Sequence, residues 1–425
     1  MIATVDKSVL GGIVVCPPSK SATHRAIFMA ALARGESTIL RPLISRDTLA
    51  TINSCRNFGA EIEIEGNAVK VVGPEKFAVR IGNVNAENSG TTIRISAAVY
   101  SLFGRRVTLT GDASLRGRPM QPIIHALESL GVKCTAEGGR PPITISGTMG
   151  GRKVSIEGSV SSQFISGLMI AAPKSANGLE IMIKGNLVSK PYIDMTVGMM
   201  GKFGVEVEEV KRHKRYRIAP QSYKPSSVTV PNDFSSAALL LAAAVLVGKN
   251  LKVAASYDDL PQGDKRIVDI LKKLGADVKM NSGISVRSAE ELKGGSFDLS
   301  DTPDLLPPLS ILALKSRRPI EIYGVAHARK KETDRIAVLA NELRKVGMKT
   351  DEREDGLTIS RGPTLNGAHL DAKEDHRLFM ALCIAGMYVG NTTVTDPDSV
   401  DVSYPGFISD MQRAGAKIRL AQTKT

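Results

Sequence analysis

Six segments of the chain share one pattern of apolar and polar positions. In each segment two apolar residues stand three positions apart, and a glycine directly follows the second of them. Apolar residues at this spacing share one face of a helix, and glycine readily takes the left-handed conformation that ends a helix. Alternating apolar and polar residues come next, which predicts a strand. The glycines stand at intervals of 72, 73, 71, 72 and 68 residues: Gly59, Gly131, Gly204, Gly275, Gly347 and Gly415.

A second predicted helix recurs with the same period, and polar residues precede it each time. These helices are expected to begin near residues 19, 88, 161, 232, 301 and 374. The chain therefore contains six copies of a unit with two helices and several strands. Six copies could form a ring, a solenoid or two globules of three, but the period exceeds that of the usual solenoid repeats. Two globules are favoured, with a break near the Pro- and Ser-rich residues 217–233.

Composition narrows the class of protein. A chain of 425 residues that is 42% hydrophobic can bury two separate cores. Lys and Arg number 56 against 43 Asp and Glu, and the resulting net charge of +13 suits anionic partners. Aromatic residues make up 4% and Trp is absent, so few side chains are available for stacking on nucleic-acid bases. The densest basic stretch, residues 211–217, is interpreted as a solvated strand edge or loop.

The cysteines indicate a reducing compartment, and the pattern of charged and apolar residues bears on targeting and membrane insertion. The four cysteines show neither CxxC pairing nor metal-ligand spacing, so inert thiols are expected. The N-terminal residues lack the charged and apolar regions of a signal peptide. The longest apolar stretch, residues 237–248, is too short to span a bilayer. A cytoplasmic protein with no membrane partner is therefore expected.

Cations at the predicted helix starts are the strongest chemical signal. Lys20 and Arg25 stand in the first turns of a helix, where the backbone dipole already places a partial positive charge. This stretch alone fits either a solvated helix start or an anion site in which amides, hydroxyls and cations converge. Gly90, in NSGT, lets a backbone amide approach a ligand closely, although a helix cap is the favoured interpretation of this stretch in isolation. Residues 327–335, HARKKETDR, form the densest charged cluster, and a solvated helical turn is the alternative there.

A series of motifs occurs in one order along the chain: SKSATHRA, NSGTTIR, RGRP, SSQFISG, SKPYID, QGD, TPD, KKETDR and EDHR. Together they resemble the 5-enolpyruvylshikimate-3-phosphate synthase family, from about residue 11 to about residue 415. The resemblance implies an α/β fold of two inside-out α/β barrels, each built from three βαβαββ repeats. One domain is expected to span residues 19–226 and the other residues 1–18 and 227–425, with the active site in the cleft between them.

The resemblance also implies a reaction. Such enzymes transfer the enolpyruvyl group of phosphoenolpyruvate to the 5-hydroxyl of shikimate 3-phosphate and release phosphate, on the shikimate pathway to chorismate and the aromatic amino acids. Addition and then elimination proceed through a tetrahedral intermediate, without a metal or an organic cofactor. The expected partners are these two small molecules, and no nucleic acid. A monomer is expected, as is inhibition by glyphosate at the phosphoenolpyruvate position.

The roles of individual residues follow from the same resemblance. Asp304 is expected to take the proton of the 5-hydroxyl, with Lys20 polarising that group, and Glu332 to deliver and remove a proton at the methylene carbon. Shikimate 3-phosphate is expected to bind Lys20, Ser21, Arg25, Ser161, Ser162, Gln163, Ser189, Tyr192, Asp304, His327 and Lys331. Phosphoenolpyruvate is expected to bind Lys20, Asn88, Gly90, Arg118, Gln163, Arg335 and Arg377.

Two positions depart from the pattern of the family. Many relatives carry a lysine where this chain has Val402, which predicts weaker binding of phosphoenolpyruvate or compensation elsewhere. His327 stands where some relatives have asparagine, and a histidine is expected to add a dependence on pH.

Two other functions compete with this interpretation. UDP-N-acetylglucosamine enolpyruvyl transferases share the fold and the chemistry, but they carry a reactive cysteine five residues before the arginine, where this chain has Ala113. A non-catalytic binder of nucleic acid or another polyanion would explain the net charge and would bind in a strongly salt-dependent way. Cations spread over the repeats, with carboxylates among them, fit a small-molecule cleft better.

Overall fold

The computed structural model describes residues 1–256, 260–281, 283–287 and 290–422. The chain forms two compact units. Unit 1 comprises Met1–Pro17, Asn232–Tyr257 and Gly263–Thr425, and unit 2 comprises Pro18–Pro231 and Asp258–Gln262. Within the described ranges, six four-stranded sheets, three in each unit, correspond to the six repeats expected from the sequence.

The second repeat shows the plan that the others follow. Its elements are β6 (Asn83–Asn85), α3 (Gly90–Tyr100), β7 (Val107–Thr110), α4 (Ala113–Arg116), α5 (Gln121–Ser129), β8 (Lys133–Glu137) and β9 (Arg140–Ser146). Strands β6 and β7 are parallel and are joined through α3, whereas β9 lies antiparallel between β7 and β8. The chain order is therefore the predicted βαβαββ, with α4 as an extra turn before the second helix.

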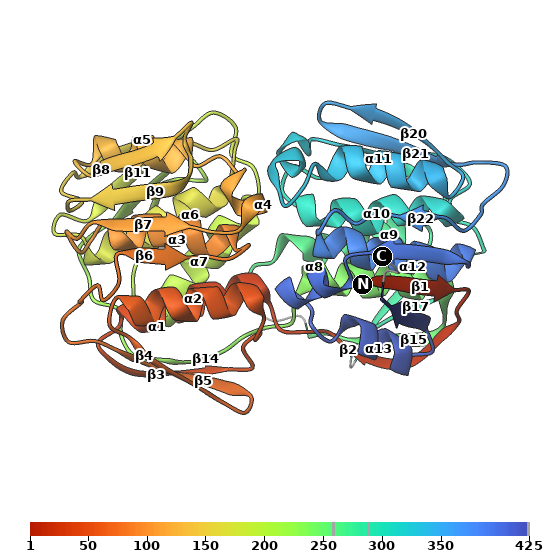
Figure 1. Ribbon diagram of the computed structural model, residues 1–425, viewed down its shortest axis with the longest axis horizontal. Coiled ribbons are helices and arrows are strands. Elements are labelled where there is room, and N and C mark those ends of the chain that lie inside the picture. Colours follow the sequence, from red (N-terminus) through yellow and green to blue (C-terminus); the bar gives the residue numbers. More distant parts are fainter. Residues whose placement is uncertain (257–259, 282, 288–289, 423–425) are drawn as a thin grey trace. The chain divides into compact units, whose positions relative to one another are not determined.

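Unit 2 contains two further repeats. The third consists of β10 (Lys153–Glu157), α6 (Ser162–Ala171), η1 (Ala172–Lys174), β11 (Leu179–Lys184), α7 (Pro191–Lys202), β12 (Glu208–Lys211) and β13 (Arg215–Ile218). The first consists of α1 (Lys20–Leu32), β3 (Gly35–Leu40), α2 (Arg46–Asn57), β4 (Glu61–Glu65), β5 (Ala68–Gly73) and β14 (Ser227–Thr229). In the first repeat α1 and α2 lie over the sheet, and its opening strand β14 comes from the last residues of the unit, parallel to β3 (Figure 1).

Unit 1 contains the remaining three repeats. The fourth has β2 (Leu10–Val15), α8 (Phe234–Val247), β15 (Gly248–Ala254), η2 (Gly263–Arg266), α9 (Ile267–Lys273), β16 (Asp277–Asn281) and β17 (Gly283–Arg287). The fifth has β18 (Gly295–Asp298), η3 (Pro303–Leu305), α10 (Leu306–Leu312), η4 (Ala313–Lys315), β19 (Ile320–Tyr323), η5 (Ala326–Lys330), α11 (Arg335–Lys345), β20 (Met348–Arg353) and β21 (Gly356–Arg361). The sixth has β22 (His369–Leu370), α12 (His376–Val389), β23 (Thr392–Thr395), η6 (Pro397–Val402), α13 (Phe407–Arg413), β24 (Lys417–Ala421) and β1 (Ile2–Asp6).

The first helix of each repeat lies inside its unit, and the sheets lie outside. All 14 residues of α8 are buried, and α8, α10 and α12 pack against one another within unit 1 (Figure 1). Such helices are apolar on every side because none of their faces meets water. This arrangement, with helices inside and sheets outside, confirms the predicted inside-out α/β architecture.

The structure also confirms the local signals from which the repeats were predicted. All six helix-ending glycines have positive φ angles, from 72° at Gly204 to 112° at Gly59. A side chain with a Cβ is strained in this left-handed conformation, which explains why glycine recurs there. Residues 211–217 span a hairpin between β12 and β13 whose residues are mostly exposed or half-buried, as interpreted from their charge.

Candidate active site

Serine side chains cap the first helices of all three repeats in unit 2. The hydroxyl oxygens of Ser19, Ser89 and Ser161 accept backbone N–H groups at 3.3, 3.1 and 3.3 Å. The residue after each cap is the first of its helix: Lys20, Gly90 and Ser162. The predicted site residues of this unit therefore stand where helix dipoles favour negative charge.

Lys20 forms an ion pair that the sequence analysis did not anticipate. Its ammonium lies 2.8 Å from Oδ2 of Asp47, in the first turn of α2, and both side chains are largely buried. A capping box between Ser45 and Thr48 fixes the start of α2 and with it the position of Asp47. This capping box was the one sequence signal that could have drawn attention to Asp47.

Arg25 is a buried cation whose hydrogen-bond partners are neutral. Nε donates to the Thr196 hydroxyl at 2.7 Å, and Nη1 donates to the Ser21 carbonyl at 2.9 Å. Nη2 donates to the Ser166 hydroxyl at 3.2 Å and to the Tyr192 carbonyl at 3.3 Å. Burial lowers the pKa of Arg25 to about 10. No carboxylate among the described residues pairs with this guanidinium, so its charge is available to an anionic ligand.

Two guanidinium groups surround the backbone at Gly90. A Cβ on Gly90 would lie 3.2 Å from Nη1 of Arg118 and 3.3 Å from Nη1 of Arg94. Arg118 donates to the Asn88 side-chain oxygen at 2.7 Å, and the Asn88 side-chain nitrogen donates to Asp112 at 2.7 Å. Asp112 therefore fixes the orientation of the Asn88 amide so that its oxygen faces Arg118. Asn88, Gly90 and Arg118, which the sequence grouped only by resemblance, lie together.

Gln163 connects this group to the third repeat. Its side-chain oxygen accepts from Nη1 of Arg94 at 2.6 Å, and its side-chain nitrogen donates to the Thr91 hydroxyl at 2.9 Å. The guanidinium of Arg94 also lies 5.0 Å from the ring centroid of Phe164. Arg94, to which the sequence analysis gave no role, is thus part of the cationic cluster.

Tyr192 lies beside Arg25, and Ser189 is hydrogen-bonded to Tyr192. The Cζ atom of Arg25 lies 5.9 Å from the Tyr192 ring centroid, and the Tyr192 amide donates to the Ser189 carbonyl at 3.1 Å. Ser189 has a φ of 56°, an uncommon conformation for a residue with a Cβ. Such strained residues concentrate at ligand-binding sites, which agrees with the role that the resemblance implies for Ser189.

In unit 1 a single buried guanidinium holds three carboxylates. Nη1 of Arg335 donates to Asp304 at 2.9 Å, and Nη2 donates to Glu332 at 2.7 Å. Asp375 accepts from Nε at 2.7 Å and from Nη2 at 3.3 Å. Burial alone would lower the pKa of Arg335, but the three carboxylates outweigh it and raise that pKa. Arg335 therefore brings together the two carboxylates that the sequence predicted to be catalytic.

Asp304 lies among three cations. Besides Arg335, its Oδ2 atom lies 3.1 Å from Nη2 of Arg377 and its Oδ1 atom lies 3.7 Å from the ammonium of Lys331. Burial would raise the pKa of Asp304, but the charges of Arg377, Lys331 and Arg335 hold it well below its ordinary value. Asp304 is thus an ionised carboxylate in the absence of ligands.

The structure corrects the expectation that His327 adds a dependence on pH to the reaction. Burial and the charge of Lys331 lower the pKa of His327 to about 4, although Asp304 partly opposes them. The imidazole is therefore neutral near neutral pH. Within the described part of the chain, its Nε2 atom is buried and has no hydrogen-bond partner. A neutral ring nitrogen of this kind can form a hydrogen bond with a substrate hydroxyl.

Asp264 is another acidic residue that sequence reasoning missed. It belongs to the QGD motif, and its Oδ2 atom accepts from the Ser235 hydroxyl at 2.5 Å. Burial and the charge of Asp304 raise the pKa of Asp264 well above its ordinary value. The motif alone gave no sign of this, because the neighbouring carboxylate comes from another repeat.

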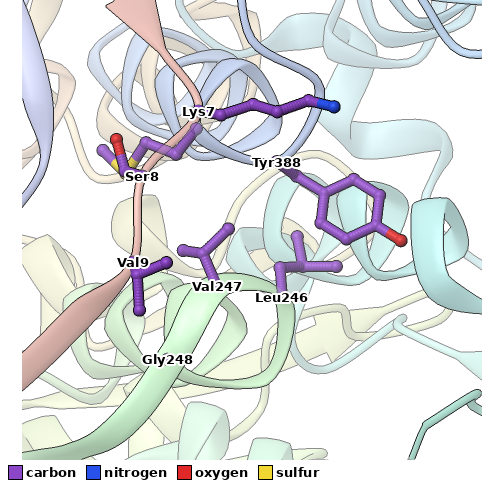
Figure 2. A pocket seen from close by; sticks show the side chains of 8 residues that line it. Lys7, Ser8, Val9, Leu246, Val247, Gly248 and Tyr388 are labelled. Carbon is purple, nitrogen blue, oxygen red and sulfur yellow. The ribbon is translucent and has the colours of Figure 1, made fainter.

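The surface cavity drawn in Figure 2 lies at the C-terminal ends of α8 and α12, away from the starts of these two helices. It has a volume of about 400 Å³, and Leu246, Val247 and Tyr388, the last residues of α8 and α12, line it together with Lys7 (Figure 2). The caps of α8 and α12, Asp233 and Asp375, stand about 20 Å away at the other ends, because a helix rises about 1.5 Å per residue. Its lining offers one ammonium and no carboxylate, so this cavity is not part of the candidate active site.

The described residues provide neither a metal-binding cluster nor a membrane-spanning helix. No group of three or more His, Cys, Asp or Glu side chains there is placed to hold a metal ion. Within the same ranges, no helix combines the length and apolar character needed to cross a membrane.

Comparison with known proteins gives one consistent family. Residues 5–411 match the family model for EPSP synthase (3-phosphoshikimate 1-carboxyvinyltransferase). The chain is 53% identical to the 3-phosphoshikimate 1-carboxyvinyltransferase of Nitrosopumilus maritimus, over 99% of this chain and 100% of that protein. It is 44% identical to the same enzyme from Methanosarcina mazei, over 99% of each. The fold matches an EPSP synthase structure from Acinetobacter baumannii with a TM-score of 0.81 and 26% identity, over 99% of this chain and 100% of that one.

Proposed function

Because the chain belongs to the EPSP synthase family, we propose that the residues described above in units 1 and 2 share the reaction of that family. The enzyme transfers the enolpyruvyl group of phosphoenolpyruvate to the 5-hydroxyl of shikimate 3-phosphate and releases phosphate. We propose which side chain carries out each step, and we propose that residues of both units bind the substrates.

Shikimate 3-phosphate binds first at the starts of α6 and α7 in this proposal. The hydroxyls of Ser161, Ser162 and Ser189 hold its phosphate. Arg25 supplies the positive charge, since its guanidinium is buried without a carboxylate partner in the described part of the chain. Hydroxyls and amides at a helix start, with one buried cation, match the chemistry of a phosphate. The ring contacts that complete the site are assigned to Lys20, Ser21, Gln163, Tyr192, Asp304, His327 and Lys331.

Phosphoenolpyruvate binds beside Gly90 in this proposal. Its phosphate occupies the space in front of the Gly90 backbone, where Arg118 and Gln163 converge, with Asn88 orienting Arg118. The ammonium of Lys20 supplies a further positive charge to this phosphate. Val402, which stands where relatives carry a lysine, is buried in η6 and offers no cation. Arg94, which also faces Gly90, compensates for that missing charge.

Arg335 and Arg377 bind the carboxylate of phosphoenolpyruvate. In the structure the donors of Arg335 point at Asp304, Glu332 and Asp375, so the substrate must replace one of these partners. Glu332 is the one exchanged, because Asp375 is held at two points. The exchange releases Glu332 next to the carbon that it protonates.

The two carboxylates then carry the proton transfers. As Arg377 and Lys331 turn to the anionic substrates, Asp304 loses part of the positive charge that keeps it a weak base. Glu332, freed from Arg335 and beside the carboxylate of phosphoenolpyruvate, takes up a proton from solvent and delivers it to the methylene carbon, while Asp304 takes the proton of the 5-hydroxyl. The resulting tetrahedral intermediate loses phosphate as Glu332 takes a proton back from the methyl group and Asp304 passes its proton to the leaving phosphate. No step requires a metal or an organic cofactor.

The observation that carries this proposal is the placement of Asp304 and Glu332 on one buried guanidinium, with two further cations beside Asp304. The test is incubation of the enzyme with shikimate 3-phosphate and phosphoenolpyruvate, followed by phosphate assay and mass spectrometry of the product. Equimolar phosphate and a product heavier by one enolpyruvyl group are expected. Turnover with UDP-N-acetylglucosamine instead, or binding of a polyanion without turnover, would contradict it.

We further propose a monomer that works in the cytoplasm and binds no nucleic acid. The dispersal of cations over the helix starts supports the absence of nucleic-acid binding, because it suits small anions better than a continuous polyanion. Light scattering of the enzyme tests the monomer, and a titration with duplex DNA at moderate salt tests the absence of nucleic-acid binding.

A further inference from the structure

Four fully buried side chains form a continuous hydrogen-bonded chain through three helices of unit 2. Nδ1 of His24, on α1, lies 2.7 Å from the Thr51 hydroxyl on α2. That hydroxyl lies 2.6 Å from the Thr92 hydroxyl on α3, which donates to the Ser89 hydroxyl at 2.7 Å. Ser89 is the cap of α3. This series of hydrogen bonds thus connects His24, in the first half of α1, to the residue that precedes Gly90.

The direction of every hydrogen bond in this chain follows from proton counting. Thr92 spends its one hydroxyl proton on Ser89, so Thr51 must donate to Thr92. His24 must then donate from Nδ1 to Thr51, which places a proton on Nδ1. Burial, with the charges of Lys20 and Arg25, keeps the ring neutral by lowering the pKa of His24 well below its ordinary value. Because each hydrogen bond in this series then has one fixed direction, the four side chains are held in one arrangement.

This chain runs beside the ion pair of Lys20. His24 and Thr51 each stand four residues, about one helical turn, after Lys20 and Asp47 respectively. The Thr92 hydroxyl also lies 3.4 Å from the Asp47 carbonyl. The chain therefore fixes α2, which carries the partner of Lys20, against α3, which presents Gly90.

We propose that His24, Thr51 and Thr92 are positioning residues for phosphoenolpyruvate, which set the start of α3 relative to Lys20. The inference rests on the proposed placement of the phosphoenolpyruvate phosphate at Gly90 and Lys20. None of the three residues touches the substrate in this account. This series of hydrogen bonds does not extend to the starts of α6 and α7, where the proposal places shikimate 3-phosphate.

The same pair of helices offers a matched control. Ser54 on α2 and Ser96 on α3 form a second buried hydroxyl pair at 2.8 Å, about one turn farther from the start of α3. Loss of a hydroxyl from either pair leaves its partner buried without that hydrogen bond. Of the two pairs, only Thr51 and Thr92 are hydrogen-bonded onward to Ser89, the cap of α3.

The experiment compares Thr51→Val with Ser54→Ala by steady-state kinetics and thermal unfolding. The two are expected to lose similar stability, but Thr51→Val should raise the KM for phosphoenolpyruvate about 3- to 10-fold over Ser54→Ala, the range equivalent to one net hydrogen bond. The KM for shikimate 3-phosphate should match between the two. Thr51→Ser, which keeps the hydroxyl, should restore the parental KM. His24→Asn, which keeps a donor near Nδ1, should stay near parental, whereas His24→Leu should resemble Thr51→Val.

Equal KM values for phosphoenolpyruvate in Thr51→Val and Ser54→Ala would overturn the inference, as would failure of Thr51→Ser to restore the value. A change confined to the KM for shikimate 3-phosphate would also overturn it. A parent that releases no phosphate from the two substrates defeats the proposed function and this inference with it. Parental turnover with equal KM values defeats the inference alone.

Discussion

Arg335 and Asp375 form a buried ion pair with two points of contact, in which Nε donates to Oδ2 at 2.7 Å and Nη2 donates to Oδ1 at 3.3 Å. Asp375 also caps α12 by accepting the backbone N–H groups of Arg377 and Leu378. The pair thus joins the start of α11 to the start of α12. Arg335 keeps Nη1 for Asp304 and a second proton of Nη2 for Glu332.

Arg335→Lys is expected to lose both activity and stability. One ammonium cannot reach three carboxylates, so buried negative charge is left unpaired, at a cost of about 3–5 kcal/mol in the free energy of unfolding. Chemical denaturation and kcat measure the two effects. Arg34→Lys is the control, because Arg34 forms an exposed pair with Glu75. If both variants unfold at the same denaturant concentration, Arg335 does not organise the carboxylates.

Gly90→Ala is expected to discriminate between phosphoenolpyruvate and glyphosate. The new Cβ would lie 3.2 Å from Arg118 and 3.3 Å from Arg94, so both guanidinium ends must shift by a few tenths of an ångström. The longer inhibitor has less room than the substrate, so its Ki should rise more than the KM for phosphoenolpyruvate. Gly201→Ala is the control, since a Cβ there meets nothing within 4 Å. A Gly90→Ala enzyme as sensitive as the parent would show that the inhibitor binds elsewhere.

His327 is expected to make folding, rather than catalysis, depend on pH. Its pKa is about 4 in the folded protein and about 6.5 in the unfolded chain. Between these values the unfolded chain binds a proton that the native state does not, so stability falls with falling pH, by about 1.4 kcal/mol per pH unit. The difference in unfolding free energy between the parent and His327→Asn isolates this effect from other groups, including Asp264. A constant difference between about pH 6.5 and about pH 4 would contradict it.

The same variant tests the correction made to the sequence-based expectation. His327 is neutral near neutral pH, so the kcat/KM profiles of the parent and His327→Asn should have the same shape between about pH 6 and about pH 9. A transition that disappears with the histidine would restore the original expectation.

Asp304→Asn is expected to lower kcat by about 10²- to 10⁴-fold, the usual contribution of a positioned base. Shikimate 3-phosphate should still bind, since the substituted amide keeps the shape of the side chain and the proposal assigns the phosphate contacts to unit 2. Calorimetry of binding and phosphate release separate the two effects. Near-parental turnover would remove Asp304 from its role.

Local signals made much of the fold predictable. The glycines that end helices and the caps at Ser19, Ser161 and Asp375 depend on neighbouring residues, so their period revealed the repeats directly. The pairing of β14 with β3 was not predictable from such signals, because it joins residues almost two hundred positions apart.

The site was predictable in its residue types but not in its pairings. Lys20 and Arg335 stood out because cations at helix starts are unusual, and Asp304 stood out through the family resemblance. Their partners Asp47 and Asp375 did not, because each is an ordinary acidic residue at a helix start and meets its cation only through packing. Resemblance supplied roles, whereas the structure supplied the pairing of Arg335 with three carboxylates.

Deuterium incorporation in D₂O tests the central claim, that Glu332 moves a proton at the methylene carbon, most directly. Addition brings a solvent deuteron to that carbon, and elimination then removes one of its three hydrogens, so product from the parent should carry deuterium in its enolpyruvyl methylene. Glu332→Gln should lower this incorporation about 10²- to 10⁴-fold, together with phosphate release. Product without solvent deuterium, or parental incorporation by Glu332→Gln, would contradict the account.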